Sequence, residues 1–403
     1  MLRILIVKLS AIGDVIHCLP AASAIKQMLP DCELTWLVEP ASAPLLEGNP
    51  VVDRLLVLPK GKWKSAFKFP AKPPVVLGTI SEIQSFVAKL RGLHFDLAID
   101  AQGLLKSAVL ARVSGARKVT GFAGTREFAE HLLSDRLNIG DYFGGKSHIV
   151  DLNLALAEFS VAGLTDNEAN SEKHHTHVCF PLPTPSALDC QVVDKLLAPL
   201  GLAAASGLAP SVELVPQAAS IPGAERGSEE NSSPDMGPLI GLIPGTTWAT
   251  KIWPADYWTE LGSRLVSRFS AKIILLGGPA DKEIANHIYK GLQLPESSVV
   301  NLVGETSLMQ LVALFSKVKL VIGADTGPMH LACATGAPLV LAVHGASPWL
   351  RNGPYGPKCT VVHTDLDCQP CFSKTCKLGT IACLKDLPVE KVFYEASKLL
   401  TGE

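Results

Sequence analysis

Short apolar runs alternate with stretches of helical periodicity along most of the chain. Residues 3–9 are rich in Ile, Leu and Val, and apolar side chains then recur every three or four positions from Val15 to Leu29. The first pattern predicts a buried strand and the second an amphipathic helix. The same alternation continues to residue 159 and predicts a doubly wound parallel sheet. We expect further strands at 33–38, 52–58, 95–100 and 118–122, and helices at 41–47, 80–90, 104–113, from 126 and up to 159.

The alternation restarts at residue 239 and predicts a second domain of the same α/β class. Its expected strands are 239–243, 272–276, 299–303, 320–322 and 339–343, and its expected helices are 254–269, 281–292, 308–315 and one from Pro328. Between them, residues 203–237 are rich in Ala, Ser, Gly, Pro and Glu without periodicity. We therefore predict one domain over 1–202, a flexible insertion or linker over 203–237 and a second domain over 238–403, with a central cleft between the two domains.

The strand at 320–322 is followed by Gly-Ala-Asp-Thr-Gly-Pro-Met-His at residues 323–330, where we expect a tight turn into a helix. A helix that starts there presents free backbone N–H groups, the Thr326 hydroxyl and a positive dipole end. Such a helix terminus suits an anion. The structural alternative is an ordinary helix cap by Asp325 or Thr326.

Asp14 follows the first expected strand and lies after Gly13, at the edge where open α/β sheets place their ligands. Its structural alternative is again a helix cap. Three spaced glycines would be needed for the Rossmann dinucleotide fingerprint, and only Gly13 is present. A nicotinamide-dependent enzyme is therefore disfavoured.

The strand at 239–243 leads into a loop, residues 244–254, that combines Gly245, several hydroxyls and Lys251. Hydroxyl and ammonium donors at a sheet edge suit a diphosphate. The Walker spacing is absent, which argues against an ATPase. A further turn at 277–283 carries Asp281 and Glu283, which predict either a ribose contact or an acidic first helical turn.

The chain has 403 residues, 36 Lys and Arg against 38 Asp and Glu, and a formal charge of −2. This balance gives no whole-chain basic field for nucleic acid. Lys8 and Asp14 interrupt the apolar N-terminus too early for a signal peptide, and the longest apolar runs are too short for a transmembrane helix. We expect a cytoplasmic protein. Residues 60–74, rich in Lys, Phe, Trp and Pro, predict a surface loop that contacts an amphiphilic acceptor or a membrane, or is simply solvated.

Four of the ten cysteines lie close together near the C-terminus, namely Cys368, Cys371, Cys376 and Cys383. Four thiols within such a short segment suit a structural Zn²⁺ or an iron–sulfur cluster, although the spacing matches no standard motif. Reduced surface thiols are the alternative. Neither interpretation gives these residues a catalytic role.

Three segments together resemble the family 9 glycosyltransferases, the ADP-heptose:lipopolysaccharide heptosyltransferases. They are Ile-Val-Lys-Leu-Ser-Ala-Ile-Gly-Asp-Val-Ile-His at 6–17, Asp-Ala-Gln-Gly-Leu-Leu-Lys-Ser at 100–107 and the segment at 323–330. The chain looks more like heptosyltransferase I than II. The resemblance implies a GT-B fold of two Rossmann-like domains, with the acceptor on the first and ADP-heptose on the second.

The resemblance also implies roles for individual residues. Asp14 matches the proposed catalytic base, which takes a proton from the acceptor hydroxyl as it attacks the anomeric carbon with inversion and without a required cofactor. Donor contacts fall on Thr246, Thr247, Lys251, Asp281, Glu283, Asp325, Thr326, Gly327 and His330. Acceptor contacts fall on Lys8, Ser10, Gly13, Gln102, Lys106, Arg126 and His148. The implied acceptor is Kdo2-lipid A, whose carboxylated Kdo sugars suit a basic lining, at the inner face of the membrane.

Alternatives remain within and outside this class. The acceptor could be a heptose, as for heptosyltransferase II, or the donor another nucleotide sugar. A metal or redox protein based on the four cysteines would leave Asp14 and the 246–251 loop unexplained.

Overall fold

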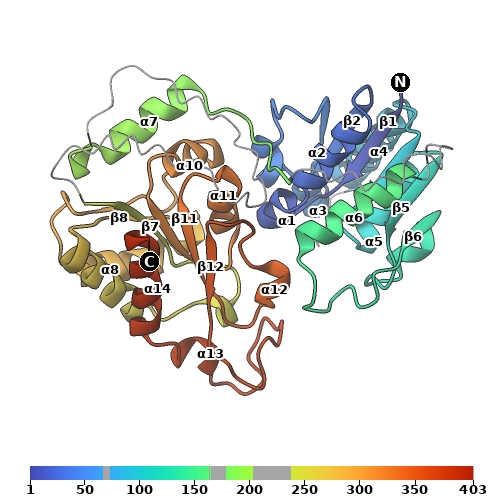
Figure 1. The fold of residues 1–403 in the computed structure, drawn as a ribbon. Helices are drawn as coiled ribbons and strands as arrows, with labels where there is room; N and C mark the ends of the chain where they lie inside the picture. The colour runs from blue at the N-terminus through green and yellow to red at the C-terminus, as the bar shows by residue number, and fades with distance from the viewer. Residues whose placement is uncertain (67–72, 163, 165–177, 203–236, 403) are drawn as a thin grey trace, which may run out of the picture. The chain divides into compact units, whose positions relative to one another are not determined.

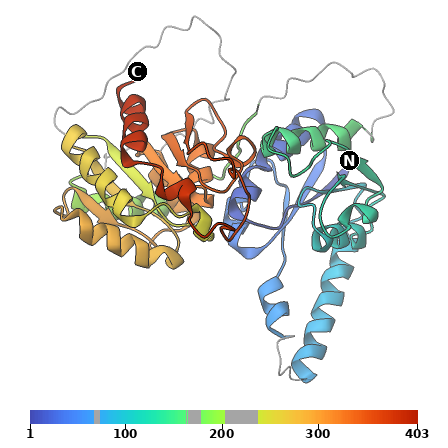
Figure 2. The ribbon, with the colours of Figure 1, turned by 90° about the horizontal axis from the view of Figure 1, so that it is seen from below.

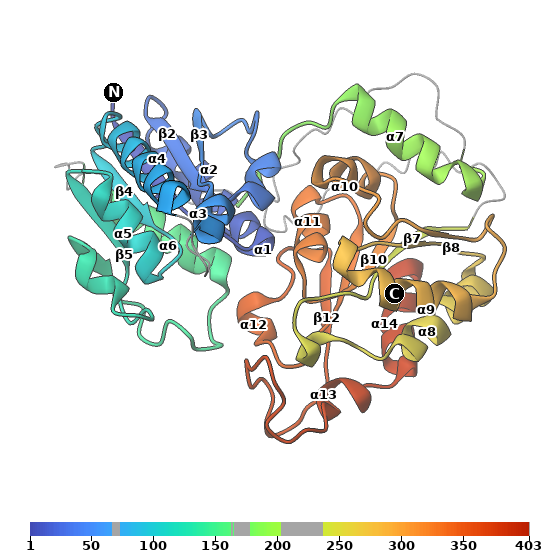
Figure 3. The same ribbon diagram turned by 180° about the vertical axis from the view of Figure 1, so that it is seen from behind.

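The computed structural model divides the chain into two compact units, Met1–Pro183 and Thr184–Glu403. It describes all residues except 67–72, 163, 165–177, 203–236 and 403. Each unit contains one six-stranded, wholly parallel sheet with helices on both faces (Figures 1 and 3). The α/β class and the doubly wound architecture predicted from the sequence are therefore confirmed.

The first sheet has the strand order β3-β2-β1-β4-β5-β6. Its strands are β1 (Arg3–Val7), β2 (Glu33–Val38), β3 (Arg54–Val57), β4 (Leu97–Asp100), β5 (Lys118–Phe122) and β6 (Asp135–Leu137). The central strands are apolar and almost fully buried, as expected where both faces of a sheet are covered. The helices are α1 (Ile12–Ile16), α2 (Leu19–Met28), α3 (Lys60–Ala66), α4 (Pro73–Arg91), α5 (Leu105–Val113) and α6 (Ile149–Ala162), with the 3-10 turns η1 (Pro40–Leu45) and η2 (Ala129–Leu132).

The second sheet has the order β12-β11-β10-β7-β8-β9. As in the first sheet, the first strand of the unit, here β7, lies at the centre beside the fourth, here β10. Its strands are β7 (Leu239–Ile243), β8 (Lys272–Leu275), β9 (Val299–Asn301), β10 (Leu320–Ala324), β11 (Leu339–Val343) and β12 (Cys359–Val362). Its helices are α7 (Ala187–Leu197), α8 (Ala255–Phe269), α9 (Lys282–Leu292), α10 (Leu308–Phe315), α11 (Gly327–Thr335), α12 (Trp349–Asn352), α13 (Ala382–Lys385) and α14 (Val389–Thr401). The 3-10 turns are η4 (Ala198–Leu200), η5 (Ala249–Lys251) and η6 (Pro279–Asp281).

The boundary between the units lies earlier than the sequence predicted. Helix α7 packs on α10, and Lys317 forms an ion pair of 3.0 Å with Asp194 of α7. The division therefore falls after Pro183 and not after residue 202, because α7 buries its apolar side against the second unit. The predicted insertion over 203–237 lies, except for Gly237, outside the described residues, but the elements on both sides of it belong to the second unit.

The prediction of a loop over residues 60–74 was wrong at both ends. Helix α3 covers Lys60–Ala66 and α4 begins at Pro73, and the two lie side by side and project from the first sheet (Figure 2). Trp63 packs edge-on against Phe86 with ring centroids 5.5 Å apart, which explains why a polar-looking segment is helical. The helix expected from residue 126 starts only at Ala129, as the turn η2. Among the described residues, no helix is long and apolar enough to cross a membrane.

Candidate active site

Strands β1 and β4 lie next to each other in the first sheet and run parallel. The strands that follow β1 are added on one side of this pair, and those that follow β4 on the other side. Ligands of open parallel sheets bind at the carboxyl ends of such a strand pair. Val7 pairs with Asp100 in register, so the segments that follow, residues 8–14 and 101–106, meet at this edge. The predicted catalytic base and several predicted acceptor residues are thus brought together.

Lys8 and Gln102 tie these two segments to each other. The Lys8 ammonium donates to the Ala101 carbonyl at 2.7 Å, and the side chain is only 2% exposed. The Gln102 amide oxygen accepts the N–H groups of Leu9 and Ser10 at 3.0 and 3.2 Å. Both side chains therefore fix the shape of the turn around Ser10, and their contact with an acceptor stays a prediction.

Asp100 at the end of β4 is a residue that the sequence reasoning did not select. Its Oδ1 accepts the N–H groups of Gln102 and Gly103 at 3.0 and 3.1 Å. Burial raises the pKa of this carboxyl to about 6, although these donors, the Ser107 hydroxyl and the Lys8 ammonium act in the opposite direction. Asp100 is therefore a buried organiser of the turn that carries Gln102.

Asp14 lies in the first turn of α1, half-buried and directly after Gly13. Its Oδ2 accepts the N–H of Ala11 at 2.8 Å, which closes the helix terminus. The N-cap residue is Ala11 and not Asp14, so the predicted N-cap role is wrong. Asp14 instead accepts from the N-cap backbone at the third helical position, and this contact fixes the direction of its carboxylate. Since this contact uses Oδ2, the Oδ1 atom remains able to accept a proton from a ligand. The role of Asp14 as a base stays a prediction.

Lys106 is held by Glu39, which follows β2 and also contacts Lys60. The two ammonium groups lie 3.2 and 2.8 Å from Glu39 Oε1. Partial burial raises the pKa of Glu39, but hydrogen bonds from Lys60 and Lys106 outweigh it and the net shift is downward. The structure thus places Lys60 beside Lys106, with Glu39 between them. We call the two lysines the basic edge of the first unit.

Arg126 and His148 lie on the connections that follow β5 and β6. The His148 ring stands edge-on to the ring of His17, directly after α1, with centroids 5.5 Å apart, so His148 lies near the helix of Asp14. Arg126 is exposed and its guanidinium lies 4.4 Å from the centroid of the Phe143 ring.

The second unit gathers three predicted donor residues into one buried group. Lys251 Nζ lies 2.7 Å from Asp325 Oδ2, and His330 Nε2 lies 3.2 Å from Asp325 Oδ1. Asp325 and His330 are 6% and 5% exposed. Lys251 comes from the loop after β7 and Asp325 ends β10, so the group spans the switch point of the second sheet. The structure thus brings these three candidates together, and their contact with a donor stays a prediction.

Asp325 stays ionised in this group. Burial acts to raise its pKa, but the hydrogen bond with His330 and the nearby His344 and Lys251 lower it well below the usual value. His344 directly follows β11 and is fully buried, and neither of its ring nitrogens has a hydrogen-bond partner among the described residues. Burial, offset in part by Asp325, lowers the pKa of His344 to about 4. His344 is thus a neutral imidazole, and the sequence reasoning missed it.

Helix α11 starts beside this group, and the hydrogen-bond donors at its N-terminus have no acceptor within the helix. Thr326 is the N-cap residue, but its side chain makes no capping hydrogen bond. The first N–H groups of an α-helix have no partner within the helix, and here they include that of Gly327. Thr246 Oγ1 donates to the Asp325 carbonyl at 3.3 Å and so places the loop after β7 next to this terminus. The arrangement offers an ammonium, a hydroxyl and backbone N–H groups to an anion.

The remaining donor candidates are more peripheral. Thr247 is exposed in the same loop. Asp281 accepts the N–H of Gly278 at 2.8 Å and packs so tightly on Gly245 that a Cβ there would meet its carboxylate. Asp281 therefore shapes the turn, as the alternative interpretation predicted, while Glu283 is exposed in the first turn of α9. A ribose contact by either one stays a prediction.

The cysteines predicted to hold a metal are free thiols, three of them in the segment between β12 and α13 and Cys383 within α13. Within the described part of the chain, no three His, Cys, Asp or Glu side chains are already spaced to hold a metal ion.

Solved structures with the same architecture define the class. A family 9 glycosyltransferase from Veillonella parvula aligns with a TM-score of 0.71 and 20% identity, covering 100% of this chain and 98% of that chain. The E. coli heptosyltransferase WaaC with ADP aligns with a TM-score of 0.67 and 23% identity, covering 99% and 100%. The protein therefore has the GT-B fold of glycosyltransferases, as the resemblance implied.

Sequence comparison identifies the family within this class. The model of glycosyltransferase family 9 (heptosyltransferase) matches residues 83–180 and 204–382. Lipopolysaccharide heptosyltransferase 1 of Pseudomonas aeruginosa is 28% identical over 377 residues, which are 93% of this chain and 87% of the relative. The chain belongs to glycosyltransferase family 9, so the prediction of a glycosyltransferase of the heptosyltransferase family is confirmed.

Proposed function

We propose that this protein transfers L-glycero-D-manno-heptose from ADP-heptose to Kdo of Kdo2-lipid A, in the assembly of the lipopolysaccharide inner core. Family membership and the heptosyltransferase 1 named among its relatives support this choice. The single observation that carries it is the buried Lys251–Asp325–His330 group beside the open N-terminus of α11. That group offers what a nucleotide diphosphate-sugar needs, namely a cation, N–H donors and a carboxylate for sugar hydroxyls.

In the proposed reaction the donor binds to the second unit and the acceptor to the first. Asp14 takes the proton of the attacking Kdo hydroxyl, the new C–O bond forms at the anomeric carbon, and the bond to the diphosphate breaks on the opposite side. Configuration is inverted and ADP leaves. Lys251, Thr246, Thr247 and the N–H groups around Thr326 and Gly327 stabilise the charge that collects on the diphosphate. These donors make a metal ion unnecessary for the chemical step.

The acceptor side of the proposal uses the basic edge of the first unit. Lys106 and Lys60, which share Glu39 in this structure, would exchange that carboxylate for a carboxylate of Kdo. His148, Arg126 and the turn around Ser10 complete this side. Because the acceptor is a lipid, we also propose that the protein works at the cytoplasmic face of the membrane without spanning it.

The test is heptosyl transfer from ADP-heptose to Kdo2-lipid A in the presence of EDTA, with Asp14→Asn beside the wild type. Asn keeps the oxygen that caps α1 but cannot accept the proton, so turnover should fall about 10²- to 10⁴-fold while ADP affinity is unchanged.

Asp189→Asn is the matched control, because Asp189 makes the same capping contact in α7, with the Ser186 N–H at 3.0 Å. If Asp14 is only a cap, the two variants will lose similar stability and Asp14→Asn will keep its turnover. If folded wild type transfers nothing to Kdo2-lipid A but accepts a heptosylated acceptor, the assignment moves to heptosyltransferase II. Transfer only from a different nucleotide sugar would replace the proposed donor.

A further inference from the structure

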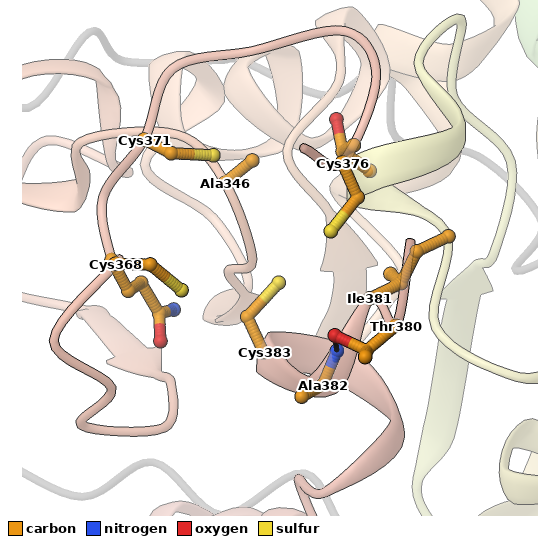
Figure 4. Close-up of a pocket in the computed structure, with 10 residues that line it drawn as sticks. Ala346, Cys368, Cys371, Cys376, Thr380, Ile381, Ala382 and Cys383 are labelled. Atoms are coloured by element: carbon orange, nitrogen blue, oxygen red, sulfur yellow. Dashed lines mark hydrogen bonds between the residues drawn. The ribbon is translucent and has the colours of Figure 1, made fainter. Parts of the chain in front are cut away.

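The four C-terminal cysteines line one pocket. Cys368 and Cys371 come from the loop after β12, Cys376 from the next turn and Cys383 from α13, and all four appear in its wall. Figure 4 shows their sulfur atoms pointing toward the interior of this pocket from different sides. Thiols brought from three turns into one pocket are the arrangement in which proteins present sulfur ligands.

The surroundings of Cys376 and Cys383 agree with this placement. Backbone N–H groups, first that of Ile381 and then three between Leu378 and Thr380, lower the pKa of the Cys376 thiol. Gly379 provides the left-handed turn, with φ of 69°, within this segment. Burial first, and then the three other thiols, raise the pKa of Cys383 to about 11. Backbone N–H groups aimed at a sulfur are the usual support of a bound thiolate.

We infer that Cys368, Cys371, Cys376 and Cys383 bind one zinc or iron ion as four thiolates in tetrahedral geometry. The pocket has a volume of about 30 Å³, which suits a single ion better than a cluster with its own sulfides. In the present arrangement the sulfurs are spread, since no three of them are spaced for coordination. One rotamer change moves a cysteine sulfur by about 3 Å, so the four sulfurs can approach one another by side-chain rotation. Each thiol gives its proton to the solvent as its bond to the ion forms.

The ion would also stabilise the proposed donor site. The segment that carries the cysteines is hydrogen-bonded to the loops that follow β7 and β11. Gln369 Nε2 donates to the Gly345 carbonyl at 2.8 Å, the Phe372 N–H donates to the Ala346 carbonyl at 2.7 Å, and Thr250 Oγ1 donates to the Ser373 carbonyl at 2.6 Å. Thr250 and Ala346 also line the cysteine pocket. The residue next to Thr250 is Lys251, so an ion that fixes residues 368–383 also fixes the loop of Lys251.

The first test measures metal directly on the full chain purified without chelator. Elemental analysis should find about one zinc or iron per chain. After removal of that ion and addition of Co²⁺, intense charge-transfer absorption near the ultraviolet and strong d–d bands should appear, as four thiolates produce. A chain that carries neither metal and gives no such cobalt spectrum overturns the inference.

The second test removes two ligands. Cys368→Ser with Cys371→Ser changes two exposed side chains, so the fold should survive, while the metal content should fall to less than about one tenth of the wild-type value. Cys190→Ser in α7, outside the pocket, is the matched control and should keep the ion. Metal retained by the double variant would place it elsewhere and overturn the inference.

The link to the donor site rests on the proposed function and has its own measurement. The double variant should bind ADP about 3- to 10-fold more weakly than wild type, because Lys251 is held less firmly. Unchanged ADP affinity in a metal-free double variant would refute this stabilising role. A wild type that holds the ion but does not bind ADP would refute the proposed donor and leave the metal site intact.

Discussion

The buried His344 allows a specific prediction about how the free energy of unfolding depends on pH. The residue follows β11, is fully buried beside Asp325, and has a pKa of about 4 in place of the ordinary 6.5. The unfolded chain therefore binds more protons than the folded one between pH 6.5 and pH 4. By linkage, the stability of the second unit falls as the pH falls through this window.

The magnitude follows from the two pKa values. With 6.5 unfolded and about 4 folded, linkage gives a loss of about 2 kcal/mol between pH 7 and pH 5 and about 3 kcal/mol below both values. Asp325 adds nothing in this window, because its pKa is lowered from an ordinary value of 3.8 and its contribution is lost only at lower pH. Asp100 acts in the opposite direction near pH 6 and below, but it belongs to the first unit.

The perturbation is His344→Leu, which removes the titrating group and also two buried nitrogens without partners. At pH 7 we expect the variant to be at least as stable as wild type, since unpaired buried polar atoms cost about 1–3 kcal/mol. Between pH 7 and pH 5 its loss of stability should be smaller than that of wild type by about 2 kcal/mol.

The assay is urea unfolding at both pH values, followed by tryptophan fluorescence. Four of the six tryptophans, Trp248, Trp253, Trp258 and Trp349, report on the second unit. His287→Gln, at an exposed position of α9, is the control and should keep the wild-type pH dependence. Equal pH dependence in wild type and His344→Leu would refute the assignment of a neutral, buried imidazole.

Two further predictions concern the turns at the two switch points. Lys251→Ala removes the ammonium from buried Asp325 and from the proposed diphosphate, so calorimetry should find ADP bound at least about 10-fold more weakly. Lys374→Ala is its control, because both ammonium groups lie over the Trp248 ring, at 4.5 Å from its centroid for Lys251 and 5.4 Å for Lys374. Equal losses in both variants would contradict a specific role of Lys251. Gln102→Ala leaves two backbone N–H groups without their acceptor and should lower the free energy of unfolding of the first unit by about 1–2 kcal/mol in denaturant titrations. Gln27→Ala, at an exposed position near the end of α2, should not. No loss in Gln102→Ala would show that water replaces the side chain.

The sequence predicted the elements that carry strong periodicity and the sheet edges at which the candidate residues gather. Strands such as β7 and β10 are unbroken apolar runs, and the residues that follow them meet because parallel strands end at one edge. Lys251 and Asp325 could therefore be grouped without coordinates. The pairing itself, in which one carboxylate takes Lys251 on one oxygen and His330 on the other, required the structure.

What the sequence missed depends on contacts between distant segments. Asp100 ends β4 and His344 directly follows β11, so a systematic look at the carboxyl end of every strand would have found both. Helix α3 was missed because Trp63 and Phe86 stabilise it only once α4 is beside it. The domain boundary was placed too late, since nothing within α7 indicates that its partner is α10.

Because α7 belongs to the second unit, residues 203–236 interrupt one folded body and do not connect the two. The flanking 3-10 turn η4 packs near β9, and the Lys272 ammonium contacts the Leu200 carbonyl, so the chain ends on both sides of this stretch are anchored to the same sheet. We expect that shortening this stretch changes the free energy of unfolding by only about 1 kcal/mol, because the closure entropy of a loop depends weakly on its length. If the chain is divided there, we expect α7 of the first piece to bind the second piece through its contact with α10.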